Sequence, residues 1–120
     1  MSFAELQSEI RAFVDVRNWR QFQKPKDLAI SISLEASELL EHFQWKDGEN
    51  LDHYLKNNKE DLQDEMADVM IYLISLAETL DVDMIEACRA KIIKNAVKYP
   101  EKEKRDFHAP INDESYATDV

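Results

Sequence analysis

Glycine occurs once in these 120 residues and proline three times, so the chain has few positions suited to tight turns or hairpins. Residues common in helices, such as Ala, Leu, Glu and Lys, are abundant and favour long helices. We therefore expect an all-α fold. With 44% hydrophobic residues, the chain is long enough for one ordinary core and too short for two, so we expect one domain.

Hydrophobic periodicity predicts four helices. Ser2 and Glu5 form a capping-box pattern, after which apolar residues recur at helical spacing. Asp47 and Gly48 are expected to end the second helix, and the pattern over residues 51–58 is ambiguous between a loop and a short helix. The expected helices cover residues 3–16, 25–45, 59–80 and 83–98.

Two further features concern domain organisation. Residues 66–77 are apolar almost all round the predicted helix, which favours burial on more than one side and, in so short a chain, a partner subunit. Beyond Pro100 the sequence is highly charged, with few large apolar residues. We expect residues 1–100 to form the helical domain and residues 101–120 to form a charged, flexible tail.

Charge and targeting signals limit the partners. A formal net charge of −10 repels a nucleic-acid backbone. The sequence shows neither a signal peptide nor a run of about 18 uncharged apolar residues. The lone Cys88 excludes an intramolecular disulfide and thiolate-rich metal sites, and it suits a reducing compartment. We expect a cytoplasmic protein that binds neither nucleic acid nor membranes.

Two pairs of carboxylates lie within the most apolar sequence: Glu35 with Glu38, and Glu65 with Asp68. A spacing of three places each pair on one helix face, so two antiparallel helices can bring four carboxylates together. Carboxylates so close repel each other unless a cation offsets their charge. The alternative is two solvated faces with lysine partners. The sequence around Glu35 and Glu65 fits a cation site and a solvated face equally well. Asp68, among apolar neighbours, fits a solvated face poorly.

The ligand type indicates which cation such a site prefers. Di-iron bundles use Glu-x-x-His on paired helices, and neither pair here ends in His. All-oxygen ligation favours Mg²⁺, with Mn²⁺ as the second option. Because Mg²⁺ usually completes its shell with water and substrate phosphate, the pattern indicates phosphate chemistry.

The order of the motifs is Glu-x-x-Glu, 26 intervening residues and then Glu-x-x-Asp. It resembles that of the MazG-like nucleoside triphosphate pyrophosphohydrolases, and four surrounding blocks look most like the small dCTP-preferring branch. The resemblance covers residues 6–100 and implies a four-helix bundle-like subunit, assembled as a dimer or a dimer of dimers. The blocks are residues 17–25, 38–45, 68–73 and 94–100.

The resemblance also implies hydrolysis of a nucleoside triphosphate, such as dCTP, to the monophosphate and pyrophosphate, as house-cleaning of nucleotide pools. Glu35, Glu38, Glu65 and Asp68 would hold Mg²⁺. A metal of this kind activates a water for attack on the α-phosphorus and offsets charge on the departing pyrophosphate. Glu38 is the first candidate for orienting or deprotonating that water and Glu35 the second, a choice that spacing alone leaves open.

Four aromatic residues are candidates for the nucleobase pocket, since aromatic faces stack on bases. The family likeness supports this role for Trp19, Trp45 and Tyr72. The alternative for Phe22 and Trp45 is an ordinary core or subunit-interface role. The four are Trp19, Phe22, Trp45 and Tyr72.

Lys91, Asn95 and Lys98 fall on one helix face at i, i+4 and i+7. Lysines on a helix are most often a solvated face, but the family pattern aims these three residues at the triphosphate. Asn95 has below-average helix propensity and no capping role in mid-helix, which favours a hydrogen-bonding duty.

The sequence departs from the family pattern at two positions, the first of which leaves the preferred base open and the second of which changes packing more than chemistry. Gln23 stands where relatives often carry His, and Leu34 precedes Glu35 where relatives often carry Gly. Two other functions stay as alternatives: a non-catalytic helical module that binds a divalent cation or a basic partner, and a pyrophosphohydrolase of the same fold for phosphoribosyl-ATP. Trp19 and Trp45 weigh against the second alternative because they resemble the dCTP branch.

Overall fold

The computed structural model describes residues 1–101, so the predicted tail from residue 102 onward lies outside the described residues. Within them the chain is all-helical and has no β-strand, which confirms the predicted class. None of these helices combines the length and the apolar run needed to cross a membrane. The elements are α1 (Phe3–Val16), a 3₁₀ turn η1 (Arg20–Phe22), α2 (Pro25–Glu41), α3 (Gly48–Asn57), α4 (Lys59–Thr79) and α5 (Met84–Lys98).

Two units make up the chain, and they are described separately. The first covers residues 1–83 and holds α1 to α4, whereas the second begins at Met84 and holds α5. The four predicted helices are present as α1, α2, α4 and α5, and the ambiguous segment 51–58 belongs largely to the additional helix α3. The bundle arrangement and the assembly into oligomers stay predictions.

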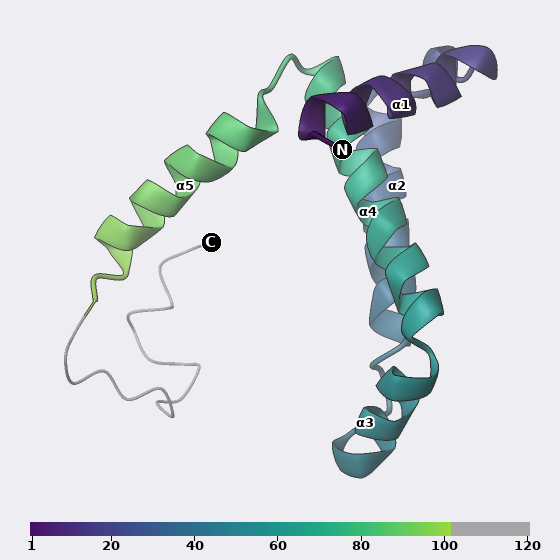
Figure 1. Cartoon of the computed structure of the whole chain (residues 1–120), viewed down its shortest axis with the longest axis vertical. Coiled ribbons are helices and arrows are strands. Elements are labelled where there is room, and N and C mark those ends of the chain that lie inside the picture. Colours follow the sequence, from purple (N-terminus) through teal and green to yellow (C-terminus); the bar gives the residue numbers. More distant parts are fainter. Residues whose placement is uncertain (102–120) are drawn as a thin grey trace. The chain divides into compact units, whose positions relative to one another are not determined.

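The first unit is built on α2 and α4, which run antiparallel along each other, while α1 lies across one end of the pair and α3 follows the other end (Figure 1). Leu28 of α2 is the most deeply buried side chain, at 1% exposure. Arg11 of α1 pairs with Glu78 of α4 at 3.1 Å, which fixes α1 over this end. The other core side chains are Ile10, Val14, Ile74 and Ala77.

Local capping explains where α1 begins. The Ser2 hydroxyl accepts a hydrogen bond from the Glu5 backbone N–H at 3.1 Å, as the capping pattern predicted. The helix then runs over Phe3–Val16, the range predicted from its periodicity. At the start of α2, Pro25 occupies the first turn, where its missing N–H has no intrahelical partner to lose.

The junction between α2 and α3 differs from the prediction. Helix α2 ends at Glu41, four residues before the expected Trp45. The N–H groups of His42 and Phe43 bond carbonyls only three residues back, and Trp45 then has a φ of +69°, outside the right-handed helical region. Asp47 and Gly48 begin α3 and do not merely end α2: the Asp47 carboxylate accepts a hydrogen bond from the Gly48 N–H at 2.8 Å. The sequence signal for a stop was therefore the N-cap of α3, the short helix that the pattern over residues 51–58 had left open.

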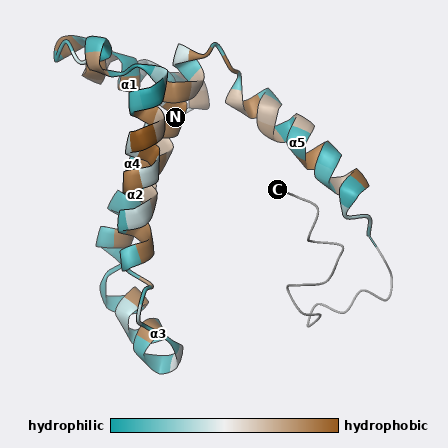
Figure 2. Cartoon of the chain, turned by 180° about the vertical axis from the view of Figure 1, so that it is seen from behind, coloured by the Kyte–Doolittle hydropathy of each residue, from teal (hydrophilic) through white to brown (hydrophobic). Residues whose placement is uncertain are grey.

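Helix α5 has no buried residue within its own unit. Ile85, Ile92 and Val97 are all exposed in the described structure. Figure 2 shows the hydrophobic residues distributed along α5 among polar ones, and concentrated in the first unit along α4.

Candidate active site

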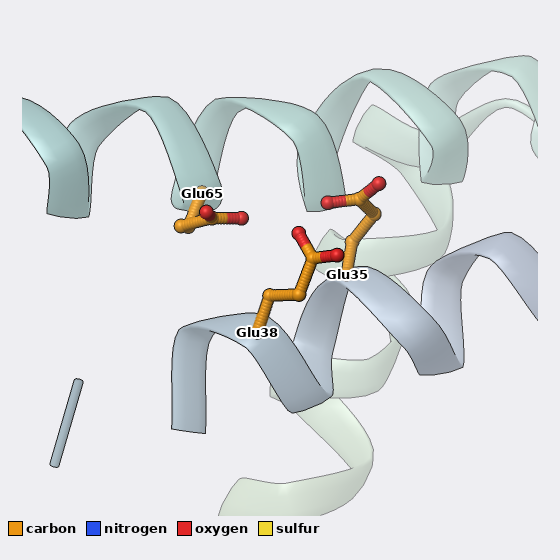
Figure 3. Close-up of side chains that lie close together, drawn as sticks. All are labelled: Glu35, Glu38 and Glu65. Carbon is orange, nitrogen blue, oxygen red and sulfur yellow. The ribbon is translucent and has the colours of Figure 1, made fainter. Parts of the chain in front are cut away.

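Three carboxylates meet between α2 and α4. Glu35 and Glu38 lie one turn apart on α2, and Glu65 faces them from α4 (Figure 3). Each offers one carboxylate oxygen, and these three oxygens lie within 4.8 Å of one another. The i, i+3 spacing on α2 and the antiparallel run of α4 together place the charges at one point, as predicted for these three residues.

The electrostatics of this triad are unfavourable without a counter-ion. Glu35 Oε2 and Glu65 Oε2 are buried and have no hydrogen-bond partner. Desolvation, followed by the hydrogen bond and charge of Glu38 and the charges of Asp68 and Glu65, raises the pKa of Glu35 to about 7. Desolvation and Glu38 also raise the pKa of Glu65, an effect that His42 partly opposes. Acids arranged in this way are stabilised by a bound cation.

The donor set fits a hard divalent cation. Its members are carboxylate oxygens only, which are the ligands that Mg²⁺ and Mn²⁺ prefer. The two orphaned oxygens of Glu35 and Glu65 provide ligand atoms that no protein group already occupies. Three protein ligands leave coordination positions for water and for phosphate oxygens.

Asp68 does not join this triad. Its carboxylate is not part of the group within 4.8 Å, although the i, i+3 spacing places it on the same side of α4 as Glu65. Its charge still contributes to the raised pKa of Glu35 and of Glu65. Asp68 also lines the neighbouring aromatic pocket, so it connects the acidic centre to that pocket.

The aromatic pocket has a volume of about 420 Å³ and lies between α1, the 3₁₀ turn and α4. Trp19 and Tyr72, both predicted for the nucleobase, line it together with Asp68. Phe13 and Gln23 also line it, and the rings of Phe13 and Trp19 meet edge to face with centroids 5.5 Å apart. The sequence interpretation missed Phe13, which it treated as part of the apolar stripe of the first helix.

Phe22 and Trp45 do not line this pocket. Phe22 is 67% exposed in the 3₁₀ turn. Trp45 is 93% exposed in the turn after α2. Of the four predicted base-binding aromatics, the structure of the first unit therefore brings two together, and the roles of the other two stay predictions.

A second hollow, of about 600 Å³, opens on the other side of the triad. It contains Glu38 and Glu65 and extends the acidic surface along both helices. Three of its acids, Glu41, Asp61 and Asp64, were not among the predicted site residues. They continue the helical spacing of the two predicted carboxylate pairs, and this spacing was the signal available in the sequence. The remaining lining residues are Glu41, His42, Tyr54, Asp61 and Asp64.

The three predicted triphosphate-binding residues lie on α5, in the second unit. Lys91, Asn95 and Lys98 keep the helical spacing that places them on one face of α5. The Lys98 ammonium also lies 5.7 Å from the centroid of the Tyr99 ring. Their contribution to a phosphate site stays a prediction.

The chain is similar to proteins of known kind. It matches the MazG-like family over residues 30–113. The dCTP pyrophosphatase 1 of Homo sapiens is 39% identical over 90 residues, which are 73% of this chain and 53% of that protein. The Bos taurus protein of the same name is 37% identical over the same shares. The chain thus spans about half the length of these curated relatives.

A solved structure agrees with the fold. The crystal structure of a pyrophosphatase from Archaeoglobus fulgidus superposes with a TM-score of 0.78 at 41% sequence identity. The match covers 82% of this chain and 92% of that one. The all-helical architecture is therefore shared along most of both chains.

Proposed function

The chain belongs to the MazG-like family, and we propose that it hydrolyses a deoxynucleoside triphosphate such as dCTP to the monophosphate and pyrophosphate, with Mg²⁺ bound. The observation that carries the proposal is the triad of Glu35, Glu38 and Glu65, with two buried carboxylate oxygens that lack a partner. The names of the relatives support the substrate class, since they are called dCTP pyrophosphatases.

In this proposal Glu35, Glu38 and Glu65 hold Mg²⁺, with Mn²⁺ as a substitute, and Asp68 adds charge from the pocket side. When bound, the metal supplies polarisation of phosphoryl oxygens and a lowered pKa for a nucleophilic water. Glu38 interacts with both Glu35 and Glu65 and is the exposed member of the triad. It therefore orients the water and takes its proton, with Glu35 as the second candidate for this role.

The reaction joins the water oxygen to the α-phosphorus and breaks the bond from that phosphorus to the bridging oxygen of pyrophosphate. The nucleobase stacks on Trp19 and Tyr72, whose pocket lies next to the acidic centre through Asp68. The Gln23 amide lines the same pocket and supplies hydrogen bonds to the base or sugar. Phe22 and Trp45, which do not line this pocket in the described chain, also contact the base in the proposed complex.

Lys91, Asn95 and Lys98 of α5 donate to the triphosphate oxygens in the proposed complex. The chain works as a homodimer or dimer of dimers, which the exposed apolar residues of α2 and α4 support. Its role is the removal of unwanted triphosphates from cytoplasmic nucleotide pools. The exposed residues include Leu34, Leu40, Met66 and Met70.

A substrate panel tests the proposal. The chain is incubated with dCTP, dATP, dUTP or dTTP and Mg²⁺, and pyrophosphate release is followed for the wild type and for Glu38→Gln. We expect release from at least one nucleotide and a loss of about a hundredfold or more in the variant. If no nucleotide yields pyrophosphate, or if Glu38→Gln acts at the wild-type rate, the proposed function fails.

A further inference from the structure

The turn that carries Trp45 is held in an uncommon conformation. Trp45 has a φ of +69°, in the left-handed region that bulky side chains rarely adopt. Its side chain is 93% exposed, so the contacts of the indole within the chain do not account for this backbone. Other residues must therefore hold the turn, since a conformation of this kind persists only where its surroundings determine it.

Tyr54 of α3 contacts the turn on both sides of Trp45. Its hydroxyl lies 2.6 Å from Nδ1 of His42, three residues before Trp45. Its ring lies under the Lys46 ammonium, 4.2 Å from the ring centroid, and Lys46 directly follows Trp45. All three contacting residues are partly buried, whereas Trp45 between them is exposed. The Tyr54 side chain thus contacts His42 and Lys46, which lie on either side of Trp45 in the turn.

Tyr54 itself has a fixed support. Its carbonyl accepts hydrogen bonds from the Asn58 backbone N–H at 2.9 Å and from the Asn58 side-chain amide at 2.8 Å. At the other end of α3, the Asp47 carboxylate accepts a hydrogen bond from the Gly48 N–H, directly after the turn. These hydrogen bonds hold the Tyr54 backbone in the last turn of α3, from which its side chain reaches the α2–α3 turn.

We propose that Tyr54 is a positioning residue that holds Trp45 ready to contact the nucleobase; this inference rests on the base-contacting role of Trp45 in the proposed function. A turn released from Tyr54 relaxes toward the commoner right-handed conformations. The fraction of molecules with Trp45 in place then falls, and the apparent affinity for nucleotide falls by the same factor. Chemistry at the triad is unaffected once the nucleotide is bound.

Kinetics distinguish positioning from general support of the fold. Tyr54→Phe removes the hydroxyl and keeps the ring, Tyr54→Leu removes both contacts, and His53→Gln is the matched control because His53 is an exposed residue of the same helix that bonds Asn57. For Tyr54→Leu we expect a KM for dCTP raised about five- to tenfold with kcat within about twofold of the wild type. Tyr54→Phe is intermediate and His53→Gln is unchanged.

A double mutant tests the link to Trp45. If Tyr54 acts through Trp45, Tyr54→Leu adds nothing to the KM of Trp45→Ala. Independent, multiplying effects of the two substitutions would overturn the inference, as would a fall in kcat with an unchanged KM, or an equal KM change in His53→Gln.

Fluorescence tests whether Tyr54 holds the turn of Trp45, and this measurement does not depend on enzymatic activity. Because the chain has two tryptophans, Trp19→Phe leaves Trp45 as the sole emitter. In that background, Tyr54→Leu is expected to lower the steady-state anisotropy of Trp45, while His53→Gln leaves it unchanged. An unchanged anisotropy in Tyr54→Leu would overturn the inference. If the wild type releases no pyrophosphate, the proposed function fails, and the anisotropy still decides whether Tyr54 holds this turn.

Discussion

Glu35 of α2 and Glu65 of α4 face each other across the helix pair, and each keeps one buried carboxylate oxygen without a hydrogen-bond partner. Two partly buried carboxylates, each with one buried and unpartnered oxygen, disfavour a metal-free fold, because a charge without a counter-ion is costly to desolvate. A divalent cation between them removes this cost. The site is thus coupled to the stability of α2 against α4, and this coupling can be measured without substrate.

Added Mg²⁺ is expected to raise the melting temperature of the wild type by about 3–8 °C at saturation, because it binds the folded chain and not the unfolded one. Glu65→Gln removes a ligand and is expected to abolish most of this shift. Asp27→Asn, an exposed acid on α2 away from the triad, serves as the control and keeps the full shift. Differential scanning calorimetry checks the three proteins; a wild type indifferent to Mg²⁺ would contradict the prediction.

The pH dependence of stability follows from the raised pKa of Glu35, which moves from 4.5 to about 7 on folding. Between these values the folded chain retains a proton that the unfolded chain has lost, so this group makes the free energy of unfolding fall as pH rises. The raised pKa of Glu65 acts in the same direction. We expect the free energy of unfolding of the wild type, minus that of Glu35→Gln, to decline from pH 4.5 to 7 in metal-free buffer. Above pH 8 this difference is expected to level off.

Denaturant titrations at four pH values measure this difference, and saturating Mg²⁺ is expected to flatten it. The subtraction cancels the carboxylates that do not interact with Glu35, so the difference reports on Glu35 together with its neighbours Glu38, Glu65 and Asp68. A difference that rises with pH would contradict the prediction. It would show that the Glu35 carboxylate is better solvated in the folded chain than its buried, unpartnered Oε2 indicates.

Trp19→Ala is expected to raise KM for dCTP about tenfold with little change in kcat, since stacking on a base contributes about 1–3 kcal/mol. Trp19 lines the pocket beside Tyr72 and is buttressed by Phe13. Val16→Ala, an 80% exposed site at the end of α1, is the control and leaves both constants unchanged. Steady-state kinetics decide; an effect confined to kcat would remove Trp19 from the base pocket.

Lys91→Ala and Asn95→Ala are expected to weaken nucleotide binding by about five- to twentyfold, because each loses a donor to the triphosphate. The Lys91 effect shrinks at high salt, since screening weakens charge pairing, whereas the Asn95 effect persists. Arg89→Ala removes an exposed basic residue from the opposite face of α5 and serves as the control. Nucleotide titrations at two ionic strengths make the comparison, and equal losses in all three variants would point to bulk charge alone.

Local signals predicted the features of this fold that local physics decides. Helix α1 has a hydroxyl cap at Ser2 and a regular apolar stripe, and its bounds were confirmed. The same reasoning misjudged the α2–α3 junction, because no residue pattern there signals the left-handed backbone conformation of Trp45. Position-specific backbone conformations of this kind are set by tertiary contacts.

The candidate site shows the same division. The i, i+3 spacing of Glu35 and Glu38 was sufficient to predict a shared face, and the structure adds Glu65 to it. Asp68 was expected at the same point; its charge acts on Glu35 and Glu65 and it lines the aromatic pocket, and its role as a ligand stays a prediction. Spacing fixes direction around one helix, while the rotation of that helix against its neighbour comes only from packing.

Hydrolysis of dCTP in ¹⁸O-labelled water with Mg²⁺ tests the central claim most directly. If a water attacks the α-phosphorus beside the triad of Glu35, Glu38 and Glu65, the label appears in dCMP and the pyrophosphate stays unlabelled; Glu38→Gln releases neither product at a comparable rate. Label found in pyrophosphate, or release of dCDP and inorganic phosphate, would contradict the account.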